Sequence, residues 1–341
     1  MRVYLLDLKY APPFTRSLPS RLSCHHQSME PHKLLALYHT MVLARAIERR
    51  LWTLDVADSG SGGFEAVQVA AAAALRPGLD WVVPYHRDLA LCLAMGLSPL
   101  DVMLGLFGRA EDPASAGRAP AFSSRRSRIV TTSGLTGTQI VHAAGIAYAS
   151  KLKALDEVTL ASIGDRGTDS GDWHEGLNFA AVHRLPLVCL VQDNAPRAVV
   201  PPGKRAADVI ALRADGYGMA GESIDGTDFA ASFDALTRAV DRARSGRGPT
   251  LVHARVVELT SLTPRGSRQS QEQMEAISRQ DPIDRMRRDL HDSQLIDDAS
   301  DDQIHRDCIT VVEAAIDQAR SSSSPEPASA LDNVYGVGTN D

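Results

Sequence analysis

The chain has little cysteine: four residues among 341, widely scattered and never in a C-x-x-C pair. This spacing excludes a disulfide framework and a zinc site built from paired cysteines, and it favours a reducing compartment. No apolar run approaches the roughly 18 residues that a membrane-spanning helix needs. We therefore expect a cytoplasmic protein with no membrane segment.

An excess of positive charge is also missing, since the formal net charge is −6 at pH 7. Proteins that bind the phosphate backbone of nucleic acids are usually basic, so we expect no nucleic-acid partner. The short basic cluster of Arg125, Arg126 and Arg128 is interpreted as a solvated loop.

Aromatic residues make up only 5% of a chain that is 44% hydrophobic. Much of the apolar content is alanine, which predicts closely packed helices.

The remaining pattern alternates between helix and strand. Apolar residues at helical spacing predict a first helix over 32–52 and a second helix that follows the 59–63 loop and ends at residue 74. Further helices are predicted over 88–95, 99–107, 138–155, 172–184, 229–244, about 271–290 and 301–320. Short apolar runs predict strands over 81–84, 158–163, 187–191 and 251–259, with a further strand-like run at 222–224. Such alternation is typical of an α/β fold, a parallel sheet with helices on both faces.

The domain organisation predicted from these patterns is simple. Residues 29–320 form one helix-rich domain, and residues 321–341, with their serines and prolines, form a C-terminal arm. We interpret residues 1–28 as a disordered or artefactual N-terminal extension. The alternative for this segment is a weak organelle-targeting peptide, because it carries four basic residues against one acid.

The segment from Val158 to Asn194 carries the clearest chemical signal. It is predicted to run strand, turn, helix, strand, with Asp165 and Asn194 at the carboxyl ends of the two strands. Open α/β sheets bind ligands at that edge. A carboxylate and an amide oxygen there suit Mg²⁺, which substrate phosphates would also hold, and the helix from Asp172 would add its N-terminus. Taken singly, each residue is equally explained as an ordinary strand-end or turn residue.

The same segment resembles the signature of thiamine diphosphate enzymes. The matching residues are Gly164-Asp165, the run 171–181 with sequence GDWHEGLNFAA, and Asp193-Asn194. More narrowly, the chain is similar to the alpha subunits of two-chain 2-oxo acid dehydrogenases of the branched-chain, or 2-oxoisovalerate, type. The similarity covers roughly residues 30–320 and includes residues 65–68, 83–88, 138–139, 142–145, 216–219, 225–226 and 248–250.

The resemblance implies a fold, an activity and partners. Residues 29–320 would form a thiamine diphosphate-binding domain. The activity would be that of a 3-methyl-2-oxobutanoate dehydrogenase-like oxidoreductase, which decarboxylates a branched-chain 2-oxo acid and transfers the acyl group to lipoamide. The glutamate that activates the cofactor comes from the beta subunit in this family. The resemblance therefore implies a beta subunit, an α2β2 heterotetramer and a lipoyl-bearing acyltransferase component.

The resemblance also assigns residues to the cofactor. Mg²⁺ would be held by Asp165, Asn194 and the main-chain carbonyl of Pro196. The diphosphate would meet His86, where the family usually has tyrosine, and Arg87, whose guanidinium suits bidentate phosphate binding. The remaining positions expected to bind the cofactor are Gly134, Thr136, Gly164 and Arg166. A structural K⁺ ion would be held at Ser133, Leu135, Thr138 and Gln139.

Three further departures from the family pattern are more serious than the change at His86. Arg166 replaces a glycine where the backbone comes close to the cofactor, and a side chain there obstructs such an approach. Ala195 and Pro196 replace a Gly-Tyr pair. Leu262 occupies the expected place of a histidine in the active-site loop, so no catalytic residue is predicted in this chain. A catalytic acid or base contributes on the order of 10²–10⁴-fold in rate, and leucine supplies none of it.

Two alternatives therefore stay open. The first is a catalytically degenerate paralogue that keeps the fold as a binding or regulatory subunit. The second is an active alpha subunit for pyruvate or acetoin. A nicotinamide enzyme is disfavoured, because Gly216, Gly218 and Gly221 match a dinucleotide motif but follow a helix-like segment and precede a strand.

Overall fold

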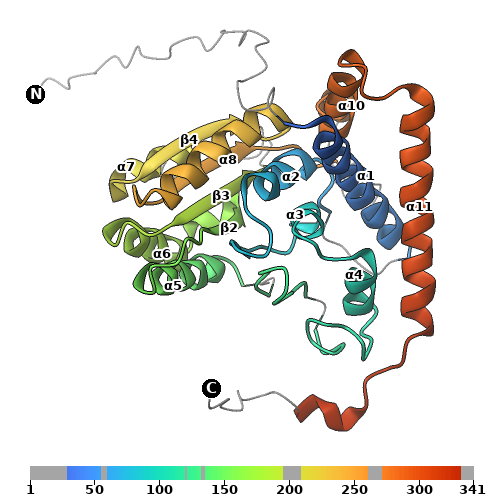
Figure 1. Cartoon of the computed structure of the whole chain (residues 1–341), viewed down its shortest axis with the longest axis horizontal. Coiled ribbons are helices and arrows are strands. Elements are labelled where there is room, and N and C mark those ends of the chain that lie inside the picture. The colour runs from blue at the N-terminus through green and yellow to red at the C-terminus, as the bar shows by residue number, and fades with distance from the viewer. Residues whose placement is uncertain are drawn as a thin grey trace, which may run out of the picture.

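A parallel β-sheet with helices on both faces forms the centre of the computed structural model, as predicted (Figure 1). The structure describes residues 29–54, 60–119, 121–131, 135–194, 209–259 and 271–331, so the predicted N-terminal extension lies outside the described residues. None of the helices in these ranges is both long and apolar enough to cross a membrane.

The sheet has five described strands, and each pairs in parallel with its neighbours. They are β1 (Trp81–Val83), β2 (Thr159–Gly164), β3 (Leu187–Asp193), β4 (Ala220–Asp225) and β5 (Thr250–Arg255), in the order β1-β2-β3-β5-β4. Parallel strands bring all their carboxyl ends to one edge. That edge is where the polar residues after β2 and β3 lie.

The predicted strand over 251–259 is too long. β5 ends at Arg255, and the next amide, that of Val256, still donates to the carbonyl of Asp193 at 2.9 Å. The chain then leaves the sheet, because the amide of Leu259 donates to the carbonyl of Gly62 at 2.9 Å. Residues 256–259 are thus a segment that crosses the edge of the sheet.

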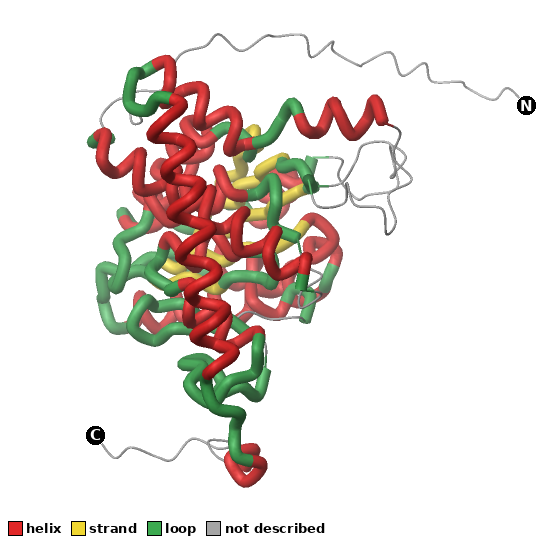
Figure 2. Tube along the Cα trace, turned by 90° about the vertical axis from the view of Figure 1, so that its right-hand side faces the viewer, coloured by secondary structure: helices red, strands yellow, loops and turns green. Residues whose placement is uncertain are grey.

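The helices form two unequal layers around the sheet. The larger core joins one face of the sheet to α1 (Pro31–Thr53), α2 (Glu65–Ala74), α3 (Leu89–Ala94), α4 (Pro99–Leu106), α8 (Phe229–Arg244), α10 (Pro282–Asp292) and α11 (Asp298–Ser321). The smaller core joins the other face to α5 (Thr138–Leu152), α6 (Gly171–Val182), η3 (Ile210–Leu212) and α7 (Arg213–Tyr217). Figure 2 shows the helices of the larger layer in front of the strands.

The predicted helix over 271–290 is divided in two. α9 (Gln271–Ser278) ends before Asp281, whose carboxylate accepts the amide of Ile283 at 2.9 Å and so caps α10. Pro282 occupies the first turn of α10, where its missing N–H costs nothing. The Asp281 cap and Pro282 therefore begin a new helix, although the apolar spacing predicts one continuous helix.

Small residues allow α5 and α6 to approach closely. A Cβ at Gly176 would lie 2.9 Å from the Ile140 side chain and 3.1 Å from its backbone carbon. Ala143, Ala144 and Ala147 of α5 are buried, whereas Gly145 and Ala149 face solvent. α7 followed by β4 also confirms that the glycines at 216, 218 and 221 lack the strand–turn–helix context of a dinucleotide motif.

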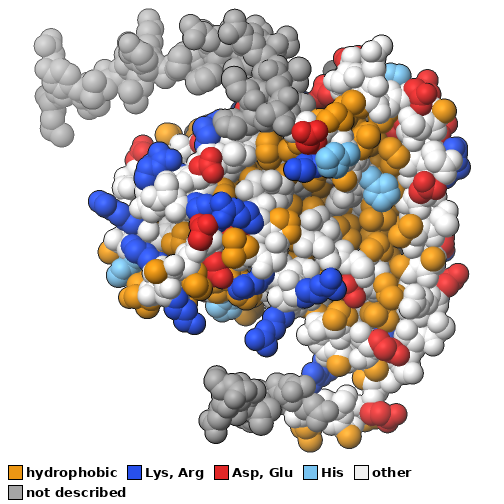
Figure 3. Space-filling model, viewed as in Figure 1, with side chains coloured by type: hydrophobic (Ala, Val, Ile, Leu, Met, Phe, Trp, Pro, Cys, Tyr) orange, Lys and Arg blue, Asp and Glu red, His pale blue; other side chains and the backbone are white. Residues whose placement is uncertain are grey.

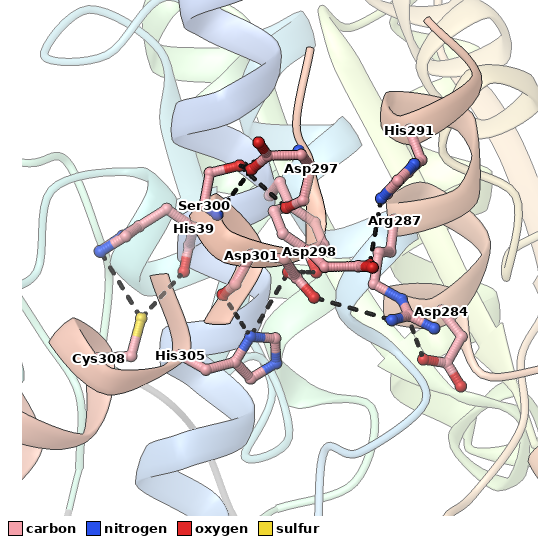
Figure 4. Close-up of polar contacts among 11 residues, drawn as sticks. His39, Asp284, Arg287, His291, Asp297, Asp298, Ser300, Asp301, His305 and Cys308 are labelled. Carbon is pink, nitrogen blue, oxygen red and sulfur yellow. Dashed lines mark hydrogen bonds and ion pairs between the residues drawn. The ribbon is translucent and has the colours of Figure 1, made fainter. Parts of the chain in front are cut away.

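α11 is fastened to α1 by buried polar contacts (Figure 4). The hydroxyl of Tyr38 donates to Asp301 at 2.6 Å, and both side chains are buried. Cys308, also buried, lies 3.8 Å from the carbonyl of His39. The last long helix is therefore part of the main core. Beyond it, η5 (Pro327–Leu331) is a single 3₁₀ segment.

Candidate functional site

Asp165 and Asn194 both lie at the carboxyl edge of the sheet. Asp165 directly follows β2 and begins η2 (Asp165–Asp169), and its side chain is buried. Asn194 directly follows β3, which pairs with β2 along its length. The strand–turn–helix connection between them thus brings a buried carboxylate and an amide to neighbouring strand ends.

Glu258 joins two of the predicted site residues. One of its carboxylate oxygens lies 3.2 Å from Nη1 of Arg87, and the other accepts a hydrogen bond from Nδ2 of Asn194. The sequence prediction missed Glu258, because it was assigned to the interior of an overlong strand. A shorter strand would have identified Glu258 as a candidate, because β5 ends three residues earlier, at the same edge of the sheet as Asp165.

The backbone around Glu258 is fitted tightly to the loop before α2. Gly63 has φ +101°, and a Cβ there would lie 2.1 Å from the carbonyl oxygen of Val257. Only glycine tolerates both the left-handed backbone and this contact. Gly63 thus leaves room for the Val257 carbonyl, and the hydrogen bond from Leu259 to Gly62 holds residues 257–259 against the loop.

Tyr85 lies among the charged groups of the site. Its ring packs beside Gly164, where a Cβ would be 3.5 Å away. Burial raises the pKa of the Tyr85 hydroxyl well above its usual value, as does the negative charge of Asp88, with smaller contributions from Asp165 and Glu258. The buried Tyr85 hydroxyl therefore lies within electrostatic range of all three carboxylates.

The two predicted diphosphate ligands differ in exposure. His86 is exposed and packs edge-on against Tyr85, with ring centroids 5.0 Å apart. Partial desolvation and the charge of Arg87 lower the pKa of His86, which favours its neutral form. Arg87 is half-buried, with its guanidinium 5.7 Å from the centre of the Phe64 ring.

A buried network of hydrogen bonds centred on Asp88 supports the turn that carries Arg87. Asp88 is fully buried and accepts the amide of Tyr85 at 2.9 Å, Nε2 of Gln192 at 2.7 Å and the hydroxyl of Ser162. Burial raises the pKa of Asp88 to about 6, although these hydrogen bonds oppose the shift. Nε2 of Gln68, also 3.3 Å from Asp88, donates to the carbonyl of Arg87 at 3.0 Å. This network ties the turn that carries Arg87 to β2 and β3.

A second histidine contact fixes the end of β3. Nε2 of His253 lies 2.9 Å from a carboxylate oxygen of Asp193, and Nδ1 lies 3.2 Å from the hydroxyl of Ser223. His253 is buried in β5, between β3 and β4. Its contact with Asp193 holds the residue immediately before Asn194.

The positions predicted to bind K⁺ are partly described. The hydroxyl of Thr138 donates to the carbonyl of Leu135 at 3.4 Å. Nε2 of Gln139 donates to the carbonyl of Ser162 at 3.3 Å, while its Oε1 is buried and accepts no hydrogen bond within the described residues. Thr136 is exposed. Four predicted positions lie outside the described residues: Ser133, Gly134, Pro196 and Leu262.

Arg166 fits its position without backbone strain. It lies in η2 with an exposed side chain, and it is not among the described residues with positive φ. The arginine therefore does not require the conformation that glycine would supply there. The following Gly167 is tightly enclosed, since a Cβ would lie 2.4 Å from the Ile163 side chain.

A charged cluster supports the loop that holds residues 257–259. Arg45 pairs with Glu65 at 2.6 Å, and Glu65 accepts the amide of Gly63 at 2.8 Å. Glu48 accepts the hydroxyl of Ser61 at 3.2 Å. Burial, followed by the negative charge of Glu65, raises the pKa of Glu48 to about 7, against the opposing charge of Arg45.

Replacing Glu48 by glutamine is expected to stabilise the protein at pH 8 by about 2 kcal/mol. The folded state keeps the Glu48 proton up to about pH 7, whereas the ordinary value of 4.5 applies after unfolding. This group therefore lowers stability as the pH rises from 4.5 to 7, and the whole penalty is present above pH 7. Urea unfolding at pH 5 and pH 8 tests this. A variant that is less stable than wild type at both pH values would contradict it.

No cluster of three or more histidine, cysteine, aspartate or glutamate side chains is arranged for metal binding within the described ranges. A Mg²⁺ site of the predicted kind does not need one. Mg²⁺ in phosphate-binding sites is commonly held by one or two carboxylates, with substrate phosphates and water completing the shell.

Comparison with known proteins gives consistent matches. Residues 39–328 match the family described as dehydrogenase E1 component. The chain is 36% identical to the 2-oxoisovalerate dehydrogenase subunit alpha of Bacillus subtilis (strain 168), over 88% of this chain and 94% of the relative. It is 34% identical to the 3-methyl-2-oxobutanoate dehydrogenase subunit alpha of Mycobacterium tuberculosis (strain ATCC 25618 / H37Rv), over 82% and 76% of the two chains. The pyruvate dehydrogenase E1 component subunit alpha of Staphylococcus aureus (strain Mu50 / ATCC 700699) is 28% identical, over 89% and 82%.

Proposed function

This chain belongs to the dehydrogenase E1 component family, and we propose that it is the alpha subunit of a thiamine-diphosphate-dependent dehydrogenase for branched-chain 2-oxo acids. The observation that carries the substrate class is the 36% identity to a 2-oxoisovalerate dehydrogenase subunit alpha along 94% of that relative. We further propose that residues 29–320 form the cofactor-binding domain and residues 321–341 an arm.

The described residues fit the diphosphate and its cation. Nη1 of Arg87 is buried and makes no hydrogen bond within the described part, although it lies 3.2 Å from Glu258. Diphosphate oxygens are the acceptors that suit such a group. Asp165 and Asn194 would hold Mg²⁺ together with the carbonyl of Pro196, and the fit is supported by the position of the first two at neighbouring strand ends.

Thiamine diphosphate supplies the carbon nucleophile and the electron sink that decarboxylation of a 2-oxo acid requires. The residues of this chain bind and orient it. Arg87 and His86 would contact the diphosphate, with Gly164 and Arg166 beside it and Gly134 and Thr136 as further contacts. The network around Asp88 would keep Arg87 in place. Leu262 offers no proton, so the acid–base groups would come from elsewhere in the assembly.

The proposed K⁺ site, like the diphosphate site, is supported by a buried polar atom that lacks a hydrogen-bond partner among the described residues. Gln139 offers a buried Oε1 with no hydrogen-bond donor among the described residues, and the hydroxyl of Thr138 already meets the carbonyl of Leu135. Carbonyl and amide oxygens are ligands that hard cations accept. Ser133 would complete the set.

We propose a beta subunit, an α2β2 assembly and a lipoyl-bearing acyltransferase as partners. Exposed apolar side chains on α5 and α6 support a protein partner: Val141, Leu152, Phe179 and Val182. Figure 3, drawn in the same view as Figure 1, also shows hydrophobic side chains over the middle and right of the molecule, with Lys and Arg mainly to the left and below. Exposed apolar patches commonly mark such interfaces. The scattered cysteines agree with a cytoplasmic setting.

The substrate is tested with the chain assembled with a beta subunit and the acyltransferase. Acylation of the lipoyl groups of the acyltransferase is measured with 3-methyl-2-oxobutanoate, pyruvate and acetoin. We expect the branched-chain acid to have the highest kcat/KM. A higher value for pyruvate or acetoin would reassign the substrate. Cofactor binding without turnover of any substrate would identify a non-catalytic subunit, which the replacement at Leu262 favours.

A further inference from the structure

We propose that Glu258 is an internal anion that competes with the cofactor diphosphate for Arg87, an inference that rests on the proposed function. Glu258 uses both carboxylate oxygens in the site. One lies 3.2 Å from Nη1 of Arg87, and the other accepts from the amide nitrogen of Asn194. A single carboxylate thus engages one residue assigned to the diphosphate and one assigned to the metal ion.

The place of this carboxylate is set by the backbone. Residues 257–259 lie close against the loop before α2, because Gly63 admits the Val257 carbonyl at a distance that no side chain would permit. The amide of Leu259 is bonded to Gly62 on the other side of Glu258. The Glu258 side chain is 27% exposed, and that of Arg87 is 24% exposed. The pair is therefore partly shielded from water.

Carboxylate and phosphate are the two anions that a guanidinium binds best, and they bind it in the same way. A diphosphate that reaches Arg87 must displace Glu258 or approach it closely. Asp165 already contributes a second carboxylate near the same tyrosine. Like charges at such short range disfavour binding, and partial burial weakens the screening. Glu258 therefore lowers the affinity for the diphosphate.

Replacing Glu258 by glutamine removes the charge and keeps the shape. In the complex with the beta subunit, we expect Glu258→Gln to lower the Kd of thiamine diphosphate at saturating Mg²⁺ by about tenfold. Glu258→Ala should also lower this Kd. Because alanine has no amide, this variant shows whether the effect in Glu258→Gln comes from a new contact of the glutamine side chain. The matched control is Glu222→Gln on β4, which breaks the exposed pair with Arg238 of α8 and should leave the Kd unchanged.

Calorimetric titration separates the outcomes. Binding that is tighter in both Glu258 variants than in wild type supports the proposal. Equal or weaker binding overturns it, and weaker binding would make Glu258 a ligand of the cation. If wild type binds and Asp165→Ala does not, the proposed function stands whatever Glu258 does. If no variant binds, the proposed function and this inference both fail.

Discussion

Replacing Asp165 by alanine is expected to weaken Mg²⁺-dependent binding of thiamine diphosphate by at least about a hundredfold. Asp165 is buried at the end of β2, where its carboxylate is the charged group that we assign to the metal ion. Without it, the cation would keep only an amide and a main-chain carbonyl from this chain. The measurement is a calorimetric titration of the assembly with the beta subunit.

The control lies in the same short helix. Asp169 pairs with Arg213 at 2.9 Å, and its side chain is 60% exposed. Asp169→Ala changes the net charge by the same amount and should alter the affinity by no more than about twofold, because exposed pairs contribute little. Equal losses in the two variants would indicate a general effect of charge. No loss in Asp165→Ala would remove this residue from the metal site.

Asp88→Ala is expected to lower the free energy of unfolding by about 3 kcal/mol. The carboxylate is fully buried and accepts hydrogen bonds from Tyr85, Gln192 and Ser162. Truncation leaves these donors facing a cavity. Leaving a buried donor unpaired costs about 1–3 kcal/mol, and some of these donors keep a second partner. Urea unfolding of the variant and the wild type at equal concentration measures the loss.

Asp302 provides the comparison for this prediction. It is an exposed aspartate of α11, and Asp302→Ala should change stability by no more than about 0.5 kcal/mol. If Asp88→Ala were as mild as this control, the network beneath Arg87 would not be a structural support. A stable Asp88→Ala variant with weakened cofactor binding would instead make Asp88 a positioning residue for Arg87.

The fold was predictable where local patterns agreed with tertiary packing. β2 and β3 are fully buried runs between helices, and their apolar character alone identified them. The rule that ligands bind at the carboxyl ends of parallel strands then placed Asp165 and Asn194 at one edge. The largest departures are that β5 ends early, where Leu259 bonds to Gly62, and that a predicted helix is divided at Pro282.

The rest of the site depends on contacts that no local pattern contains. Asn194 meets Glu258 across 64 positions of the chain, and Gln192 meets Asp88 across 104. Each residue taken singly is an ordinary polar residue of a loop or strand. Only the fold brings them together, so the sequence pattern predicts the ends of the strands but not the partners that join them.

The most direct test of the account is a calorimetric titration of the wild-type chain, assembled with its beta subunit, with thiamine diphosphate in the presence and absence of Mg²⁺. We predict saturable binding that requires Mg²⁺ and that Asp165→Ala weakens by at least about a hundredfold. Absence of binding in an assembly shown to be intact, with or without Mg²⁺, would contradict the account and identify a subunit that keeps the fold without the cofactor.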